Sequence, residues 1–400
     1  MVICLTASAV AQDVELVGSY STPNYARNVA VSDSFCYVAN DSAGLLILNV
    51  SNPANPTLIG SYDTPGLSQG VFVSGSYAYV ADYATGLQII DVSNPASPTL
   101  TGGYNTPGSA YSVFVSGSYA YVADFNAGLQ IINITTPASP TRIGRYDTPG
   151  YAVGVFVSGV YAYVADATSG LQIINVSNPA VPTLAAAYVT PDVARDIFVR
   201  DNYAYVADDY AGILIINISD PANPAFTASY ATPGSVYGVC ISYNFAYAAT
   251  QDHGLQIADI SVPSDPTYAG SYITPAIAWK VTVAGNFCYV ADHRSIVILY
   301  FYATDVEENN HLPGQFALSQ NYPNPFNAQT TIQYSLPKQS MVSIDIFDIL
   351  GRKIMTLAEG MKPAGDHQVI WDASSQSSGI HFYRLRAGDK TEIKRMLLLK

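Results

Sequence analysis

Carboxylates that recur at a constant step of 42 residues are the first candidates for chemistry in this chain. A ring of carboxylates could bind a cation, but no calcium loop of the EF-hand or nonapeptide type accompanies it. Asp or Asn at the start of a short loop also accepts backbone N–H groups as an Asx-turn, a need that every repeat shares. We therefore predict a structural role, with no bound metal and no other cofactor. The carboxylates are Asp82, Asp124, Asp166, Asp208 and Asp292, and the equivalent places in the other repeats hold Asn40 and Thr250.

Two histidines form a second candidate group. His253 and His293 fall in neighbouring repeats, close in sequence to Asp252, Asp292 and Arg294, which would allow a metal site or an acid–base pair. Two histidines without a third ligand at a usable spacing are more typical of surface loops. The sequence contains no serine elbow, phosphate-binding loop, dinucleotide fingerprint or zinc-protease helix. We expect a protein without catalytic residues; the alternative is a lactonase- or hydrolase-type enzyme that uses this histidine pair.

The elements that position these residues follow from the same period. Each repeat holds four short runs of strand-forming residues separated by Gly, Pro, Asn and Ser; in residues 68–105 they are 70–73, 77–81, 87–92 and 100–104. A fixed period of this length, built from short strands, predicts the blades of a propeller. We predict an all-β fold, with a seven-bladed β-propeller over residues 12–303. The step is marked by Tyr37, Tyr79, Tyr121, Tyr163, Tyr205, Tyr247 and Tyr289, and by a Tyr-x-Thr-Pro signature in each repeat.

The ends of the repeat region predict how the ring closes. Residues 16–23 read as a fourth strand with no blade before it, and residues 296–301 as a third strand with no fourth strand behind it. The N-terminal strand should therefore complete blade seven and leave few sheet edges exposed. In that blade Ile296 stands where the other six repeats carry Gly.

Positions that differ between the repeats are the third candidate group. In a propeller the loops from strand four to strand one, and from strand two to strand three, surround one mouth of the central channel. At the start of strand one the equivalents are Arg27, Gln69, Tyr111, Val153, Arg195, Tyr237 and Trp279, followed by Asn28, Gly70, Ser112, Gly154, Asp196, Gly238 and Lys280. Packing alone would not produce this spread. We predict a ligand-binding face that comprises Arg27, Tyr111, Arg195, Asp196, Tyr237, Trp279, Lys280, Tyr83, Phe125 and Tyr210.

Aromatic side chains gather on the same predicted face. The chain has 31 tyrosines, and several that are not part of the repeat pattern map to these loops, including Tyr25 and Tyr151. Aromatic residues with a few Arg, Asp and Asn neighbours make an adaptable recognition surface for a protein or a glycan. Alternatively, they cover the mouth and pack on each other. The sequence favours neither interpretation.

In most repeats a glycine precedes the third strand, and the residues that follow it resemble a known family. Gly86-Leu87-Gln88-Ile89-Ile90-Asp91-Val92-Ser93-Asn94-Pro95 resembles the LVIVD-repeat family of bacterial and archaeal surface propellers, and the resemblance covers residues 14 to about 301. It implies a propeller displayed at the cell surface. It implies no activity, because that family shares no catalytic motif.

Composition changes after Ala303. Residues 304–315 are polar and end in Pro313-Gly314, as a linker would. Residues 316–400 resemble the C-terminal sorting domain of type IX secretion substrates, a small Ig-like β-sandwich. The resemblance implies export across an outer membrane by the secretion machinery. It rests on NYPNPFN at 321–327, LGRKI at 350–354, GIHFYRL at 379–385 and KRMLLLK at 394–400.

The amino terminus and the charge agree with export. Residues 1–11 read as the remnant of a signal peptide, with a small-x-small site before Gln12. No later stretch approaches the ~20 apolar residues of a membrane span. Residues 1–311 hold 7 Lys and Arg against 23 Asp and Glu, within a net charge of −13, which argues against nucleic acid or an anionic membrane as the partner. We expect a monomer, secreted or on the outer-membrane surface of a Gram-negative-type bacterium, that binds a protein or a glycan there.

Overall fold

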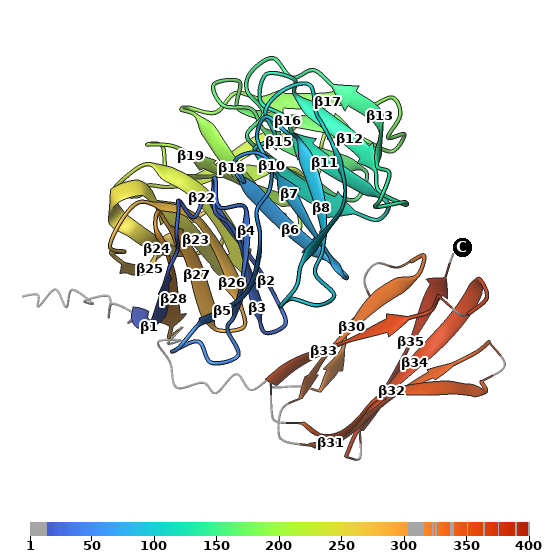
Figure 1. Cartoon of the computed structure of the whole chain (residues 1–400). Coiled ribbons are helices and arrows are strands. Elements are labelled where there is room, and N and C mark those ends of the chain that lie inside the picture. The colour runs from blue at the N-terminus through green and yellow to red at the C-terminus, as the bar shows by residue number, and fades with distance from the viewer. Residues whose placement is uncertain are drawn as a thin grey trace, which may run out of the picture. The chain divides into compact units, whose positions relative to one another are not determined.

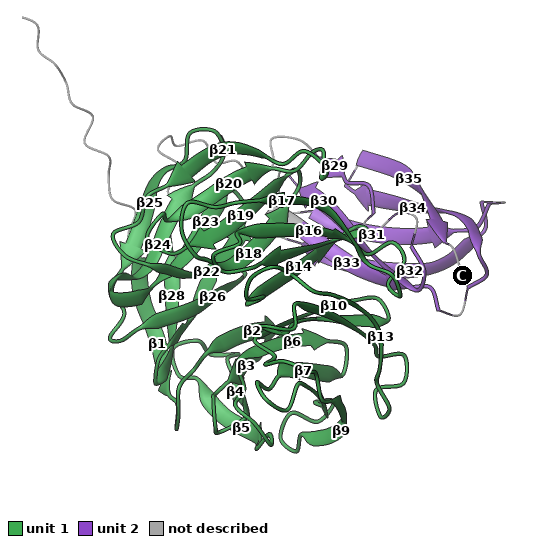
Figure 2. Cartoon of the chain, turned by 90° about the horizontal axis from the view of Figure 1, so that it is seen from above, with its two compact units in different colours: residues 1–303 green, residues 304–400 purple. Residues whose placement is uncertain are grey.

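The computed structural model describes residues 14–302 and, towards the C-terminus, residues 316–398 with gaps at 322–323, 325, 337–339, 350, 363–364, 375 and 389. The chain divides into two compact units, residues 1–303 and 304–400 (Figure 2). The predicted signal-peptide remnant (1–11) and linker (304–315) lie outside the described residues.

The first unit is a seven-bladed propeller. Its strands form seven four-stranded antiparallel sheets arranged around a central axis (Figures 1 and 2). Blade one is β2 (Asn28–Ser32), β3 (Phe35–Ala39), β4 (Leu45–Asn49) and β5 (Thr57–Tyr62); blade two is β6 (Gly70–Ser74), β7 (Tyr77–Ala81), β8 (Leu87–Asp91) and β9 (Thr99–Tyr104); blade three is β10 (Ser112–Ser116), β11 (Tyr119–Ala123), β12 (Leu129–Asn133) and β13 (Thr141–Tyr146); blade four is β14 (Gly154–Ser158), β15 (Tyr161–Ala165), β16 (Leu171–Asn175) and β17 (Thr183–Tyr188).

In the remaining three blades the first strand begins earlier and the second strand ends later than in blades one to four. Blade five is β18 (Ala194–Arg200), β19 (Tyr203–Asp208), β20 (Ile213–Asn217) and β21 (Ala225–Tyr230); blade six is β22 (Val236–Ser242), β23 (Phe245–Thr250), the 3-10 helix η1 (Gln251–His253), β24 (Gly254–Asp259) and β25 (Thr267–Tyr272); blade seven is β26 (Ala278–Ala284), β27 (Phe287–Asp292), β28 (Ser295–Phe301) and β1 (Val14–Ser21).

The repeated tyrosines hold neighbouring blades together. Tyr79 of β7 is only 4% exposed and packs with Val113 and Val122 of the next blade. The other blade interfaces repeat this arrangement. Each sheet therefore buries its apolar face against a neighbour, so the framework is stabilised by nearest-neighbour contacts around the ring.

The predicted closure is confirmed. β1 pairs antiparallel with β28 from Val14–Phe301 to Ser21–Ser295, with one irregularity between Leu16 and Gly18. Because a ring has no free edge strand at this junction, the N-terminal segment protects the outer edge of β28 from pairing with another chain.

The turn of blade seven corrects one prediction. In blade two Gly86 has φ +73°, and a Cβ there would lie 2.3 Å from the carbonyl oxygen of Tyr104, so this place requires Gly. Ile296 does not replace that glycine, and the prediction that it does is wrong. Ile296 pairs with Ala291 in the register in which Leu45 pairs with Ala39. The turn of blade seven is one residue shorter, and Ser295, which pairs with Asp292, stands where Gly254 pairs with Thr250 in blade six.

The recurring carboxylates fasten the loop by which the chain enters each blade. Thr106 Oγ1 donates to Asp124 Oδ1 (2.6 Å), and the Gly108 N–H donates to Asp124 Oδ2 (2.9 Å). The Asx-turn predicted within the carboxylate's own loop is therefore wrong, since the partners lie 16 and 18 residues upstream. Thr106 belongs to the Tyr-x-Thr-Pro signature, so this contact explains why the two signatures occur together. The same pair of contacts joins Asp166 to Thr148 and Gly150.

The second unit is a β-sandwich. One sheet has the order β29 (Ala317–Leu318), β30 (Gln329–Leu336) and β33 (Gly365–Asp372); the other has β32 (Lys353–Lys362), β31 (Ser340–Phe347), β34 (Gly379–Ala387) and β35 (Lys390–Leu398). Trp371 and Tyr383, one from each sheet, are fully buried in a shared core.

Two of the predicted sorting motifs meet in this unit. Phe326 packs on Trp371 with ring centroids 5.6 Å apart, and its N–H donates to the Leu397 carbonyl (3.0 Å). Asn324 Oδ1 accepts the Leu397 N–H (2.9 Å). Asn324 and Phe326 thus hold the terminal strand β35 in place.

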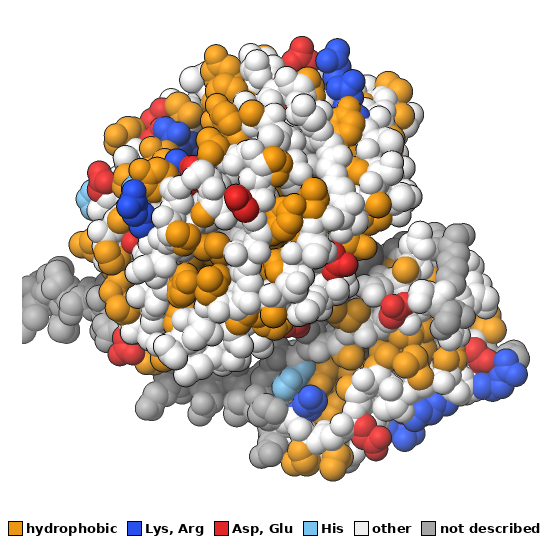
Figure 3. Space-filling view, in the orientation of Figure 1, with side chains coloured by type: hydrophobic (Ala, Val, Ile, Leu, Met, Phe, Trp, Pro, Cys, Tyr) orange, Lys and Arg blue, Asp and Glu red, His pale blue; other side chains and the backbone are white. Residues whose placement is uncertain are grey.

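The described part of the chain contains no helix with the length and hydrophobicity that a membrane crossing requires. On the face shown in Figure 3, charged side chains are sparse over the first unit, as expected from a chain in which only 12% of residues are charged.

Candidate ligand-binding site at the channel mouth

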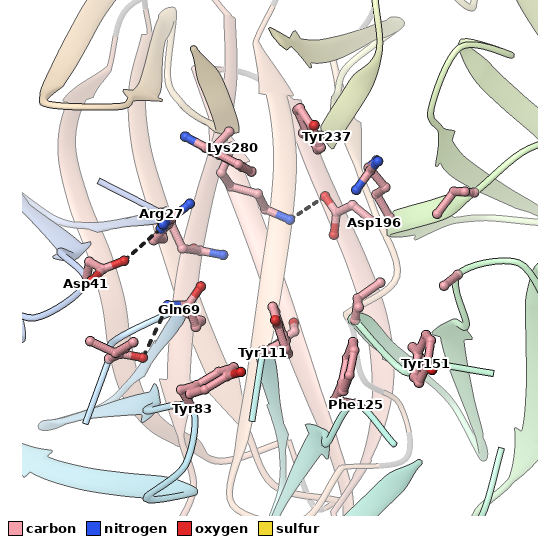
Figure 4. A pocket seen from close by; sticks show the side chains of 18 residues that line it. Arg27, Asp41, Gln69, Tyr83, Tyr111, Phe125, Tyr151, Asp196, Tyr237 and Lys280 are labelled. Atoms are coloured by element: carbon pink, nitrogen blue, oxygen red, sulfur yellow. Dashed lines mark hydrogen bonds and ion pairs between the residues drawn. The ribbon is translucent and has the colours of Figure 1, made fainter. Parts of the chain in front are cut away.

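One end of the propeller channel opens into a hollow of about 520 Å³ (Figure 4). Each of the seven blades contributes to it. Nine of the ten residues predicted to bind ligand line this hollow: Arg27, Tyr83, Tyr111, Phe125, Arg195, Asp196, Tyr237, Trp279 and Lys280. The tenth, Tyr210, does not line it, and its side chain is 74% exposed. The structure therefore brings the variable residues together in one concave surface.

The loop residue that follows each recurring carboxylate has a backbone conformation with positive φ. Tyr83 and Phe125 have φ of +51° and +46°, in the left-handed region that bulky residues seldom adopt. Reciprocal backbone hydrogen bonds hold Tyr83 to Ala110 (3.0 and 2.9 Å) and Phe125 to Ala152 (3.0 and 3.0 Å). Since each partner belongs to the segment that leads into the next blade, the bridge fixes both loops. The framework thus imposes this backbone, and the side chain at the position is left to vary.

Four rings form a continuous aromatic wall, which we define as Tyr83, Tyr111, Phe125 and Tyr151 from blades two to four. Tyr83 meets Tyr111 edge to face at 5.6 Å, and Tyr111 lies 5.3 Å from Phe125. Phe125 and Tyr151 stack with centroids 4.3 Å apart. These four residues lie along one side of the hollow in Figure 4. Each ring is held by its neighbour, so the wall is pre-organised.

Three cations occupy the other side, which we call the cationic side: Arg27, Arg195 and Lys280. Arg27 Nε donates to Asp41 Oδ2 (3.0 Å), and Arg195 binds Asp209 Oδ2 through Nε (2.9 Å) and Nη2 (2.5 Å). These ion pairs fix the direction of each guanidinium group.

Aromatic faces also support the two guanidinium groups. The Arg27 group lies 4.7 Å from the Trp279 ring centroid and 5.2 Å from that of Tyr25. The Arg195 group lies 4.4 Å from the centroid of Tyr237, and Tyr237 in turn packs on Trp279 at 4.8 Å. The geometry is that of cation–π contacts, which stabilise a partly desolvated cation.

A polar layer separates the mouth from the channel. Lys280 of blade seven forms an ion pair with Asp196 of blade five, and Asp196 Oδ2 also accepts the Val239 N–H of blade six (2.9 Å). The ion pair passes over Gly238, where a Cβ would lie only 3.1 Å from Lys280 Cδ. Below it, a second hollow of about 310 Å³ is lined largely by apolar side chains of the first strands. Four residues border both hollows: Asn28, Ser112, Asp196 and Lys280.

The histidine pair has a different environment. His293 stacks on Tyr25 at 4.3 Å, and His253 lies in η1 with its Nδ1 buried against Gly234. Asp252 is exposed, whereas Asp292 is fully buried and accepts the Ala276 N–H at 3.1 Å. Burial raises the pKa of Asp292, an effect that hydrogen bonds from Thr274 and Ala276 oppose. Within residues 14–302 and the described part of the second unit, no three His, Cys, Asp or Glu side chains are grouped so as to hold a metal ion.

Sequence reasoning missed two residues of the site. Asp41 and Asp209 orient Arg27 and Arg195, but neither was selected as a candidate. The signal was present in the sequence: each acid follows its arginine by 14 residues, and these are the two repeats with arginine at that place. The pairing could have been found by comparing two variable positions together.

Comparison with known families agrees with the repeat analysis. The LVIVD repeat matches seven successive segments, residues 23–64, 65–106, 107–148, 149–190, 193–232, 233–274 and 275–299. The chain belongs to the LVIVD-repeat family. Residues 320–399 match the secretion system C-terminal sorting domain. This LVIVD-repeat protein is therefore secreted by the type IX route, to the exterior or surface of a Gram-negative bacterium of the Bacteroidetes type.

Solved propellers resemble the first unit in fold alone. The β-propeller domain of Myceliophteria thermophila Cps50 (Swd1) has a TM-score of 0.59 at 11% identity, over 72% of this chain and 99% of that one. The WD40 propeller domain of Doa1 gives 0.57 at 13%, over 74% and 98%. The computationally designed Ika8 protein gives 0.56 at 8%, over 72% and 100%. No curated protein matches the sequence.

Proposed function

We propose that the LVIVD-repeat propeller is a non-catalytic binding module whose ligand occupies the hollow at the channel mouth, and that the sorting domain delivers this module outside the cell. The ligand is a protein segment or a glycan at the cell surface. A volume of about 520 Å³ is within the range of sites that hold small ligands or short pieces of larger ones.

The division of the repeat into two kinds of position carries this proposal. Residues that recur, such as Tyr79 and Asp124, are buried between blades or fasten loops. Residues that differ, such as Arg27, Tyr111 and Trp279, line one hollow. Packing requirements are the same in every blade, so they do not account for this spread. Partly buried aromatic and arginine side chains are the types that dominate binding energies at recognition surfaces.

An enzyme of the lactonase or hydrolase type has less support. The residues it would use do not converge: His293 is stacked on Tyr25, and Asp292 is buried with its oxygens engaged by the Ala276 N–H. A catalytic base has to reach the substrate. Neither carboxylate next to the histidines faces the hollow, because Asp252 and Asp292 are both absent from its lining.

A triple substitution at the mouth tests the proposal. Tyr111→Ala, Tyr237→Ala and Trp279→Ala together should abolish binding on a glycan and peptide array, because each anchor contributes about 2 kcal/mol or more when it is a hot spot. The variant should keep the fold, since these side chains lie at the hollow.

The matched control removes three aromatic rings that are exposed elsewhere on the propeller: Phe226, Tyr243 and Tyr268, with exposures of 56%, 62% and 49%. It should bind as the unaltered protein does. If the control loses binding while the mouth variant retains it, the ligand binds the outer surface and the proposal is wrong.

A further inference from the structure

Positive charge is concentrated at the channel mouth of an otherwise acidic unit. Residues 1–311 hold only 7 Lys and Arg against 23 Asp and Glu. Three of the seven, Arg27, Arg195 and Lys280, line the hollow, and a fourth, Arg294, lies 5.2 Å from the ring centroid of Tyr25, a ring that Arg27 also contacts. A solvated acidic surface needs no such grouping. Each of the three is paired with a carboxylate, Asp41, Asp209 or Asp196, so the grouping attracts an anionic ligand only through donors that these ion pairs leave available, while the acidic surface elsewhere repels anions.

Arg27 is the cation best placed to meet an anionic group. Its Nε binds Asp41, while among the described residues no hydrogen bond is made by its two terminal amino groups. Its faces are covered by Tyr25 and Trp279, and its side chain is 24% exposed. A guanidinium edge that is fixed in direction and has two donors available is suited to a carboxylate, which it binds in a bidentate manner.

The opposite side of the hollow suits a ring with apolar faces and hydroxyl groups. The aromatic wall presents tyrosine hydroxyls beside its ring faces, and Gln69, Asn28 and Ser112 supply further polar groups around it. Rings with an apolar body and a polar periphery pack on such surfaces. Sugar rings have this character.

An extended acidic peptide is less suitable, because such peptides gain affinity by pairing their backbone with free N–H and C=O groups. At the rim of blades one to three these groups are already used. Asp41 is paired with Ser68, Tyr83 with Ala110, and Phe125 with Ala152, in each case in both directions. Recognition here must be made by side chains.

The two sides act on one shared space. Burial raises the pKa of Tyr111, the neighbouring Tyr83 adds to this rise, and the charge of Arg27 opposes it. Arg27 and the four residues of the aromatic wall also line the same hollow, so a single ligand in that hollow meets both.

From this arrangement we infer that the ligand is an acidic glycan, in which a uronic-acid ring stacks on the aromatic wall while its carboxylate binds the Arg27 guanidinium group. The inference rests on the proposed binding function and names the ligand class for that site. Arg195 and Lys280 are each neutralised by their own Asp and are not the direct partners of the carboxylate.

The test uses the full chain and two matched probes: an oligogalacturonate, and the same oligomer with its carboxyl groups reduced to alcohols. Isothermal titration calorimetry should give at least tenfold tighter binding of the acidic oligomer, with an advantage that falls as salt is added. Arg27→Gln should remove this preference, and Arg27→Lys should retain part of it. Arg145→Gln removes the same charge from an exposed place on the outer strand β13 and should leave binding unchanged.

A double variant guards against misfolding. Arg27→Gln leaves the Asp41 carboxylate without its ion pair, so Arg27→Gln with Asp41→Asn removes both charges together, and its thermal unfolding is compared with that of the unaltered protein. Equal binding of both oligomers, lost in the Tyr111 triple variant, would overturn the acidic-glycan inference and leave the binding function intact. Binding of poly-glutamate but of neither oligomer would also overturn it, as would failure of both oligomers to bind.

Discussion

Replacing Asp124 should show how much the loop contacts contribute to the propeller. Asp124 is fully buried, and its two oxygens accept hydrogen bonds from Thr106 Oγ1 and the Gly108 N–H. Asp124→Ala removes both acceptors, and it leaves the buried Thr106 hydroxyl and the partly buried Gly108 N–H without this partner. Asp124→Asn keeps one carbonyl oxygen and adds an amino group. Asn40 already does this in blade one, where it accepts the Asn24 N–H (3.1 Å) and donates to the Asn24 carbonyl (2.7 Å).

The expected magnitudes follow from these contacts. Each hydrogen bond to a buried charged acceptor contributes about 1.5–3 kcal/mol. Burial of the carboxylate offsets part of this, because desolvation is the largest influence on Asp124 and raises its pKa, while Thr106 and Gly108 oppose the rise. We expect Asp124→Ala to lower the free energy of unfolding by about 3 kcal/mol and Asp124→Asn by about 1 kcal/mol.

The pH dependence gives an independent check on the same residue. A carboxyl whose folded pKa lies above the ordinary value of 3.8 binds protons more tightly in the folded state. Its contribution to stability is therefore complete below that value and declines as the pH rises through the folded pKa. Asn does not titrate, so the difference between Asp124→Asn and the unaltered protein should shrink as the pH rises from 4 to 7.

Urea unfolding, followed by circular dichroism, measures both effects. Asp63→Ala, at an exposed place in the loop after β5, is the control and should change stability by less than about 0.5 kcal/mol. A midpoint for Asp124→Ala equal to that of the control would refute the view that the recurring carboxylates fasten the loops. A difference between Asn and Asp that grows with pH would refute the sign assigned to the pKa.

Three further outcomes are expected. Deleting residues 14–21 leaves the outer edge of β28 unpaired, so the melting temperature should fall and light scattering should rise; an unchanged transition would contradict ring closure. Lys280→Met leaves the nearly buried Asp196 without its cation and should cost about 3 kcal/mol, most of which should return when Asp196→Asn is added; no recovery would mean that the cost is not electrostatic. Lys353, Arg384 and Thr356 outweigh the burial of Asp345 and lower its pKa to about 2, so the sorting unit should lose stability as the pH falls from 4 to 2, and Asp345→Asn should flatten that dependence in thermal melts.

Much of the propeller could be predicted because its information is repeated seven times. In blade two the predicted second strand, 77–81, coincides with β7, and the predicted fourth strand differs by one residue from β9. Each error at one boundary is corrected by the equivalent residues of six other copies. Closure was predictable for a related reason, since a spare fourth strand and a missing one have a single solution.

The errors fall where one copy differs from the rest or where contacts join distant segments. The place of Ile296 was wrong because a one-residue deletion in a turn shifts the alignment, and only the pairing with Ala291 reveals it. The partner of Asp124 was wrong because the hydrogen bond reaches back to Thr106, 18 residues away. Tyr210 lies on a loop of the expected face, yet its side chain is directed to solvent, at 74% exposure. Periodicity shows which loop a residue occupies, but the direction of a side chain depends on its neighbours.

The mouth illustrates how a repeated framework acquires an asymmetric site. Seven identical blades would surround the channel with seven identical side chains, which could recognise only a ligand of matching symmetry. Here the left-handed backbone and the reciprocal hydrogen bonds to the next blade are retained at Asp41, Tyr83 and Phe125, while the side chains range from acidic to aromatic. The bridges are made by main-chain atoms, so changing the side chain leaves them intact. Side-chain changes at the mouth therefore leave the packed interfaces between the blades undisturbed. An aromatic wall and a cationic side can then face each other within one ring, and the hollow acquires a direction that an asymmetric ligand can recognise.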